Sequence, residues 1–165
     1  MLVEHYEDKS TWGEGPWQDE PDKAQWGDPK SGVPCLIVRG PVGALCGYVG
    51  VHDDHPYFRR NYDELENIDV HGGLTFSDVC QAGGKICHKS DDGKVTWWIG
   101  FDCAHGGDYA PKHGQYRHDP EMKATAEKYK FDKLFEQKPY QTYRDMAYVE
   151  GQIQQLALQL KKKNR

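Results

Sequence analysis

The chain has 165 residues, which is enough for one domain of ordinary size and too few for two. Its aromatic content of 12%, with five Trp and ten Tyr, excludes a disordered low-complexity protein, although hydrophobic residues reach only 37%. The net charge of −5, from 21 basic and 26 acidic side chains, argues against a protein that binds duplex nucleic acid, because phosphate contacts need clustered Lys and Arg.

The N-terminal segment is rich in acidic residues, Gly and Pro, and it lacks the period of a strand or a helix. We predict an irregular acidic arm over residues 1–33, ahead of a single domain over residues 34–165. Its indoles, at Trp12, Trp17 and Trp26, should bury their apolar area against the domain or against a partner chain. The sequence shows no export signal and no run of about 18 apolar residues, so we expect a cytoplasmic protein without a membrane span.

Short apolar runs separated by turn residues predict an antiparallel sheet. Residues 34–39 and 44–51 are two such runs joined by a Pro-Val-Gly turn, which is typical of a hairpin. A long polar loop with one helical turn should follow over residues 52–67. We predict two further strands, over residues 68–76 and 95–104.

The last third of the chain predicts helices. Asp119 followed by Pro120 is a good start for a short helix that reaches residue 135. A second helix, over residues 140–162, is predicted by one apolar stripe, which consists of Met146, Val149, Ile153, Leu156 and Leu160. The stripe docks on the sheet, packs on the preceding helix, or forms the seam of a homodimer. We therefore predict an α+β fold: a small, mainly antiparallel sheet with a long C-terminal helix packed on it.

The chain has five cysteines, an odd number, and no export signal, so we expect reduced thiols or metal ligands rather than disulfides. Cys35 and Cys46 lie in apolar runs and are most simply buried. The others are Cys80, Cys87 and Cys103.

A zinc site is one interpretation of the His and Cys residues in the middle of the chain. Cys103 and His105 lie two positions apart, so they face the same way on a strand. His71 and either Cys87 or Cys80 would complete a tetrahedral set, and thiolate with imidazole favours zinc. The alternative is that these residues are buried thiols and hydrogen-bonded core histidines.

Two glycine-rich turns follow predicted strands, and each carries a histidine: His71-Gly72-Gly73 and His105-Gly106-Gly107-Asp108. Side by side, such turns can hold a small anionic ligand between their backbone N–H groups. A His beside a carboxylate on such a turn can also be a general base, which leaves a hydrolase as the alternative. The sequence has no P-loop, nucleophile-elbow, zinc-protease or dinucleotide-binding motif.

Aromatic and guanidinium side chains add to the predicted ligand site, because together they can hold a base and its phosphates. Trp97 and Trp98 are adjacent and point to opposite faces of a strand, so one belongs to the core and the other lies under a helix or at a site. We assign Trp98 and Arg59 to the ligand site. The alternative for Arg59 is a solvated loop.

Five segments carry a family resemblance: GPWQDEPDKAQW, PCLIVRG with the following LCGYVGV, DVHGGLTF, WWIGFDCAHGGDYAP and YRDMAYVEGQI. In these segments the chain resembles a family of small uncharacterised proteins encoded in tailed bacteriophages and prophages. The resemblance covers most of residues 15–110 and 143–155, whereas residues 112–140 look like an insertion. It implies an accessory protein that works in the host cytoplasm and counteracts host defence.

From these observations we expect a binding protein rather than an enzyme. Its partner would be a small anionic, nucleotide-like ligand held between the two glycine-rich turns, or a host bacterial protein. The alternative is a hydrolase that uses zinc, or His and Asp, at the same two turns.

Overall fold

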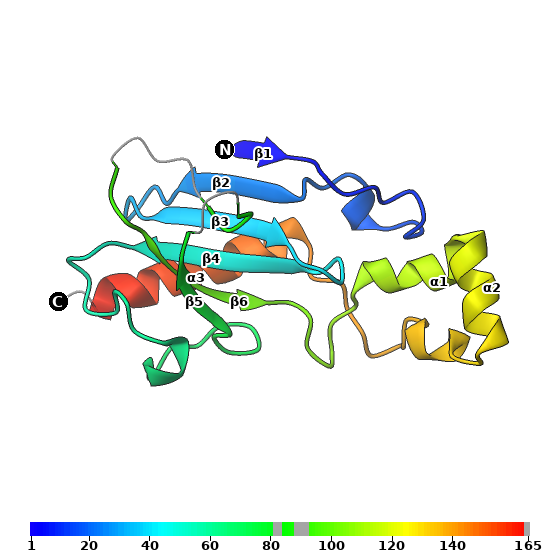
Figure 1. The fold of residues 1–165 in the computed structure, drawn as a ribbon. Helices are drawn as coiled ribbons and strands as arrows, with labels where there is room; N and C mark the ends of the chain where they lie inside the picture. The colour runs from blue at the N-terminus through cyan, green and yellow to red at the C-terminus, as the bar shows by residue number, and fades with distance from the viewer. Residues whose placement is uncertain (81–83, 88–92, 164–165) are drawn as a thin grey trace.

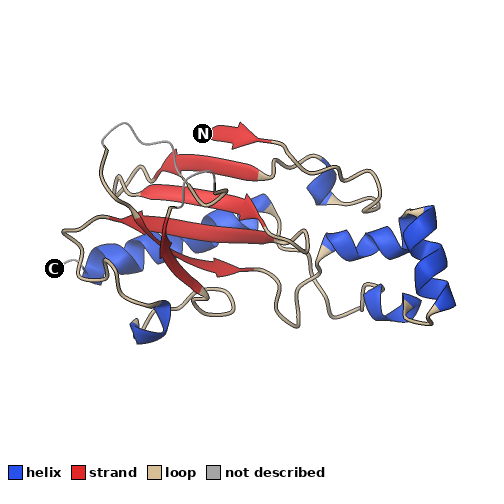
Figure 2. Ribbon diagram, in the orientation of Figure 1, coloured by secondary structure: helices blue, strands red, loops and turns tan. Residues whose placement is uncertain are grey.

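The computed structural model describes residues 1–80, 84–87 and 93–163. Six strands form one antiparallel sheet in the order β1-β2-β3-β4-β6-β5 (Figure 2). The strands are β1 Leu2–Glu4, β2 Lys23–Gly27, β3 Pro34–Arg39, β4 Leu45–Val51, β5 Phe76–Val79 and β6 Trp97–Asp102. Along one face of the sheet runs the long helix α3, Met146–Lys163 (Figure 1). The predicted α+β fold is confirmed.

The shorter helices gather mostly beyond one end of the sheet (Figure 1). They are α1 Gln115–His118 and α2 Pro120–Lys128, with the 3-10 helices η1 Pro16–Gln18, η2 Tyr62–Glu64, η3 Pro111–Gly114 and η4 Asp132–Phe135. The predicted helix after Asp119 is therefore α2 followed by η4, and the Asp119 side chain caps α2 as its sequence position suggests. Within the described ranges, no helix is long and apolar enough to cross a membrane.

Two strands lie in the N-terminal segment, so the prediction of an irregular arm over residues 1–33 is wrong at both of them. β2 pairs with β3 from Lys23 opposite Val38 to Gly27 opposite Pro34, and β1 pairs with the other side of β2. Both strands are short, and their pairing depends on the edges that β3 offers to β2 and β2 to β1. The first four residues of β2, KAQW, do alternate polar and apolar, and the two apolar side chains pack into one core cluster, but so short an alternation is a weak signal.

The predicted strand over residues 68–76 is also corrected, because β5 begins only at Phe76. Gly72 and Gly73 both have positive φ angles, of 67° and 79°, which residues other than Gly rarely adopt. The Gly73 N–H donates to the Val70 carbonyl at 2.9 Å and closes a tight turn there. The chain therefore turns at the glycine pair before it enters the sheet.

The main core lies between the sheet and α3. The helix buries the predicted apolar stripe, with Val149, Ile153, Leu156 and Leu160 each no more than 2% exposed. They pack against inward-facing strand residues, among them Ile37, Val49, Ile99 and Phe101. The stripe thus docks on the sheet of its own chain, which leaves no exposed seam for the homodimer that was one alternative.

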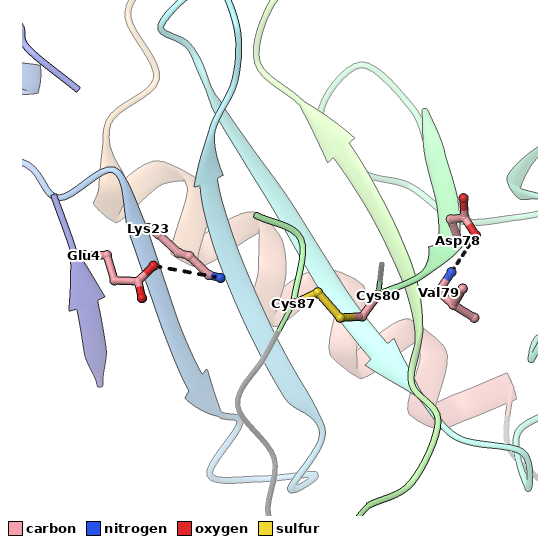
Figure 3. Close-up of a disulfide and its surroundings, with 6 residues drawn as sticks. All are labelled: Glu4, Lys23, Asp78, Val79, Cys80 and Cys87. Carbon is pink, nitrogen blue, oxygen red and sulfur yellow. Dashed lines mark hydrogen bonds and ion pairs between the residues drawn. A yellow bond between two sulfur atoms is a disulfide. The ribbon is translucent and has the colours of Figure 1, made fainter. Parts of the chain in front are cut away.

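The opposite face of the sheet carries a second apolar cluster, formed by Leu36, Val38, Tyr48 and Trp98. Phe76 and Ile86 pack against this cluster. Ile86 is followed by Cys87, which forms a disulfide with Cys80 (Figure 3). The prediction of reduced thiols is therefore wrong for this pair, whose Cα atoms lie 4.9 Å apart.

A buried ionic cluster, which we call the Arg39 cluster, fastens the N-terminal segment to the sheet. It consists of Lys9, Glu20, Asp22, Arg39 and Tyr143. Arg39 Nε donates to Asp22 Oδ1 at 2.7 Å, and Lys9 Nζ lies 2.7 Å from the same oxygen. Glu20 accepts the Tyr143 hydroxyl at 2.6 Å and the Met146 N–H at 2.7 Å, so it also caps the start of α3.

The Arg39 cluster predicts that acid lowers the free energy of unfolding. Burial alone would raise the pKa of Asp22, but hydrogen bonds from Lys9, from the Glu7 and Tyr6 N–H groups and from Arg39 outweigh it and lower the pKa to about 2. Because the folded pKa is below the usual 3.8, the stabilisation is complete above about pH 4 and is lost as the pH falls toward 2.

Urea unfolding between pH 5 and pH 2.5 should show this loss as a falling free energy of unfolding. In Asp22→Asn, the slope of that free energy against pH should be smaller, because the variant has no carboxyl group to titrate at this position. An unchanged slope in Asp22→Asn would assign the acid sensitivity to other carboxyl groups.

Candidate functional site

The two glycine-rich turns lie against each other, as the sequence predicts. His71 Nε2 is 2.8 Å from Asp108 Oδ2, and the His71 and His105 rings have centroids 5.9 Å apart. The His105 ring covers Gly72 so closely that a Cβ at position 72 would overlap it. The space between the turns is therefore filled by side chains, and a ligand has to lie beside the turns rather than between them.

Asp108 is the buried residue to which His71, His105 and Arg144 bind. Its side chain is 1% exposed and accepts three hydrogen bonds: from His71 Nε2, from the His105 backbone N–H at 3.0 Å and from Arg144 Nε at 2.9 Å. Burial alone would raise the pKa of Asp108, but these three donors outweigh it and hold the pKa below its usual value. The carboxyl group is therefore ionised near neutral pH and accepts without donating.

This ionised carboxylate determines which nitrogen of His71 carries the proton in the neutral ring. Nε2 faces an oxygen that only accepts, so Nε2 is protonated and Nδ1 is the acceptor. The Tyr148 hydroxyl lies 2.7 Å from Nδ1 and donates to it. A continuous chain of hydrogen bonds thus runs from Asp108 through His71 to the Tyr148 hydroxyl.

Tyr148 lies in the first turn of α3, one helical turn after Arg144. The Asp145 carboxylate accepts the Tyr148 N–H at 2.9 Å and so caps the helix. The Arg144 guanidinium lies 4.8 Å from the centroid of the Tyr148 ring while it binds Asp108. Sequence reasoning missed both residues, although both lie in the quoted segment YRDMAYVEGQI at the start of the helical stripe.

His105 has a second carboxylate beside it. Its Nε2 lies 3.3 Å from Asp102 Oδ1, at the end of β6, and Asp102 also accepts the Thr75 hydroxyl at 2.9 Å. The approach of His105 to Asp102 is not a hydrogen bond, since the buried His105 Nε2 has no hydrogen-bond partner among the described residues, and the ring lies over Gly72. His105 therefore belongs to the wall of the site, and the carboxylate beside it is a different one from that of His71.

Beside His71 an open cleft of about 740 Å³ runs along α3. Its lining is almost entirely polar: Asp69, Val70, His71, Gly72, Tyr148, Gln152, Gln155 and Gln159. Gln152 accepts the His71 N–H at 2.9 Å, and Gln159 binds both the N–H and the carbonyl of Asp69. Two glutamines thus hold the turn against the helix, and Gln155 lies between them on an exposed part of the cleft.

Trp98 and Arg59 are not in this cleft, so their assignment to the ligand site is corrected. Trp98 is fully buried in the cluster on the opposite face of the sheet from α3. Arg59 lies in the loop after β4, with its guanidinium 5.3 Å from the Phe58 ring centroid, and lines a separate hollow. The position of Trp98 could not be settled from sequence, because a strand residue's face depends on which side the helix covers, and Arg59 lies in a loop whose place the sequence does not fix.

The predicted zinc set of Cys103, His105, His71 and Cys87 is also corrected. Cys87 is bonded to Cys80, and both ring nitrogens of His71 bind Tyr148 and Asp108. Burial, followed by the negative charge of Asp108, raises the pKa of the Cys103 thiol well above its usual range, which opposes the thiolate that zinc requires. Among the described residues, no three His, Cys, Asp or Glu side chains are grouped to hold a metal ion.

The chain matches no protein-family model, no curated protein and no solved structure.

Proposed function

We propose that the protein binds a small, nucleotide-like ligand in the cleft beside α3, with an anionic group of the ligand at the His71 end. The observation that carries the proposal is the cleft itself, which is open, polar and about 740 Å³ in volume. Glutamine amides both donate and accept hydrogen bonds, so they suit the edge of a base or a sugar.

Asp69 is the carboxylate that lines the cleft, and it lies toward the Gln159 end. Gln159 binds the backbone N–H and carbonyl of Asp69, whose side chain is exposed, whereas His71 and Tyr148 lie near Gln152. Gln152 and Gln159 are seven positions apart on α3, which is about 10 Å along the helix axis. An anionic group is therefore expected toward Gln152, at the end of the cleft away from Gln159 and Asp69.

A matched pair of helix substitutions tests both the site and the charge of its ligand. Gln155 and Gln154 are neighbouring exposed residues of α3, but only Gln155 lines this cleft. Gln155→Lys should tighten the binding of ribonucleoside 5′-monophosphates by roughly fivefold, which corresponds to one solvent-exposed ion pair of ~1 kcal/mol. Gln154→Lys should leave their dissociation constants unchanged.

Isothermal titration calorimetry with the four ribonucleoside 5′-monophosphates and the four matching nucleosides measures these constants. The proposal expects each monophosphate that binds to do so more tightly than its nucleoside. Equal binding of a nucleoside and its monophosphate would remove the anionic group from the proposal. If neither set binds, the ligand class is wrong.

We extend the proposal, on the family resemblance given above, to a phage accessory protein that sequesters such a ligand from host defence. A sequestering protein returns its ligand unchanged when it is denatured, whereas a hydrolase returns a product. Mass spectrometry of the small molecules released from protein purified from bacterial cells distinguishes the two outcomes.

A further inference from the structure

We propose that Tyr148 is a nucleophile that takes an acyl group from an ester in the cleft, with His71 as its general base and Asp108 as a positioning residue. This inference goes beyond ligand binding and does not depend on a nucleotide-like ligand. It rests on the chain of hydrogen bonds from Asp108 through His71 to Tyr148 and on the open cleft that Tyr148 lines.

The geometry is that of an activated hydroxyl. The 2.7 Å between Tyr148 Oη and His71 Nδ1 lies within the range for proton transfer to a general base. Asp108 binds the opposite nitrogen of the same ring at 2.8 Å, fixes the tautomer and balances the imidazolium that forms when the ring accepts a proton. A nucleophile, a base and a group that orients the base are the three parts of the Ser-His-Asp arrangement, here with a tyrosine hydroxyl.

A purely structural role for the His71–Tyr148 hydrogen bond is a weaker explanation. The turn that carries His71 is already tied to α3 by Gln152 and by two hydrogen bonds to Gln159. These three bonds fix the backbone on both sides of Val70 without Tyr148. The turn therefore does not need the Tyr148 hydroxyl in order to bind α3. Because Tyr148 lines the cleft, a ligand bound there would contact this hydroxyl.

The reaction is balanced within the site. The Tyr148 oxygen forms a bond to the carbonyl carbon of the ester, and its proton passes to His71 Nδ1. The ester C–O bond breaks, and the departing alcohol takes the proton from His71. Water then attacks acyl-Tyr148 with His71 again as base, which releases the carboxylic acid and restores the tyrosine.

Acetylation by p-nitrophenyl acetate tests the proposal, because the ester reports the reaction through the release of p-nitrophenolate. Peptide mass spectrometry of the full chain gives the rate at each tyrosine. Tyr129 and Tyr140 are internal references, since they are 65% and 69% exposed and more accessible than the half-buried Tyr148. General-base assistance should make Tyr148 react about 100-fold faster than either reference, despite its lower exposure.

Three variants separate the roles. Tyr148→Phe should abolish the rapid release of p-nitrophenolate, and His71→Asn should slow Tyr148 to the rate of Tyr140. Tyr140→Phe, the matched control on an exposed tyrosine, should leave the rate at Tyr148 unchanged. Rapid release that persists in Tyr148→Phe would make His71 itself the nucleophile and would overturn the proposal.

Asp108→Ala tests the positioning residue with a readout that packing alone does not move. Nε2 then loses the oxygen that accepts its proton, so the preference for the Nε2–H tautomer should be lost, and Nδ1 would no longer be held as the acceptor of the Tyr148 proton. Nitrogen NMR of the imidazole should show Nε2–H in the wild type and a mixture of both tautomers in the variant. The same tautomer in both proteins would contradict the role given to Asp108.

A comparison in urea needs no variant. In the unfolded wild type, Tyr148 should be acetylated at the same rate as Tyr129 and Tyr140, because His71 is no longer near. An advantage that persists in urea, or one that is absent in the folded protein, would overturn the proposal. Calorimetry with nucleotides is a separate measurement on a separate probe, so either proposal can fail while the other stands.

Discussion

Arg39→Met should lower the free energy of unfolding by about 3–5 kcal/mol, the range for removing one partner from a buried ion pair. The Arg39 side chain is completely buried and ion-pairs with Asp22 and Glu20. It also donates to the Gly43 carbonyl and to the Tyr143 hydroxyl, both at 2.9 Å. Methionine can fill the volume but leaves these oxygens without their donor, and a buried polar group without a partner is costly.

Arg60→Met is the matched control for this prediction. Arg60 also pairs with a carboxylate, that of Glu64 at 3.5 Å, but the two side chains are 47% and 51% exposed. An exposed pair of this kind contributes about 0.5 kcal/mol or less. Urea unfolding followed by tryptophan fluorescence compares the two variants, and losses of equal size would contradict the buried role of Arg39.

Gly114→Ala should destabilise the protein by about 1–3 kcal/mol, the usual cost of forcing an extra methyl group into a packed site. A Cβ at Gly114 would overlap the backbone carbonyl of Trp12, which cannot move aside as a side chain tip can. Trp12 is 1% exposed and lies with Trp17 and Tyr109 in a separate apolar cluster. The substitution therefore pushes the N-terminal segment away from η3.

Gly151→Ala should stabilise the protein. Gly151 lies in the middle of α3, and a Cβ there would meet no atom within 4 Å. Alanine in a helix interior is more stable than glycine by about 0.5–1 kcal/mol, because it restricts the unfolded chain. Melting temperatures of the two variants measure the contrast, and an unchanged or raised melting temperature in Gly114→Ala would mean that the N-terminal segment does not pack on η3.

The elements that could be predicted from sequence are those whose signal is local. β3 and β4 are continuous apolar runs, and α3 carries its stripe at helical spacing, so both patterns are visible without knowledge of the partner. β1 has only three residues and depends on the edge of β2, and the strand-like alternation of KAQW in β2 was missed because it is only four residues long. Their positions follow from long-range pairing and from the Arg39 cluster, neither of which a sequence window contains.

Sequence also predicts only part of the candidate site. Glycine pairs beside His71 and His105 indicate turns at strand ends, and these turns do meet. Tyr148 and Arg144 belong to the site only because the tertiary fold places the start of α3 beside those turns. Cysteine counting failed for Cys80 and Cys87, because the number of cysteines in a chain says nothing about which two lie close enough in space to bond.

After β6 the chain passes through Asp108 into the short helices and comes back beside Asp108 at Thr142, and these two residues form an isolated parallel bridge outside the sheet. The Tyr109 N–H donates to the Thr142 carbonyl and the Thr142 N–H to the Gly107 carbonyl, both at 2.9 Å. These hydrogen bonds hold the beginning and the end of the segment with the short helices next to each other. The length of chain between Gly114 and Gln141 is therefore free to change by insertion or deletion without a shift in strand register, and the residues around Asp108 keep their places whatever that excursion contains.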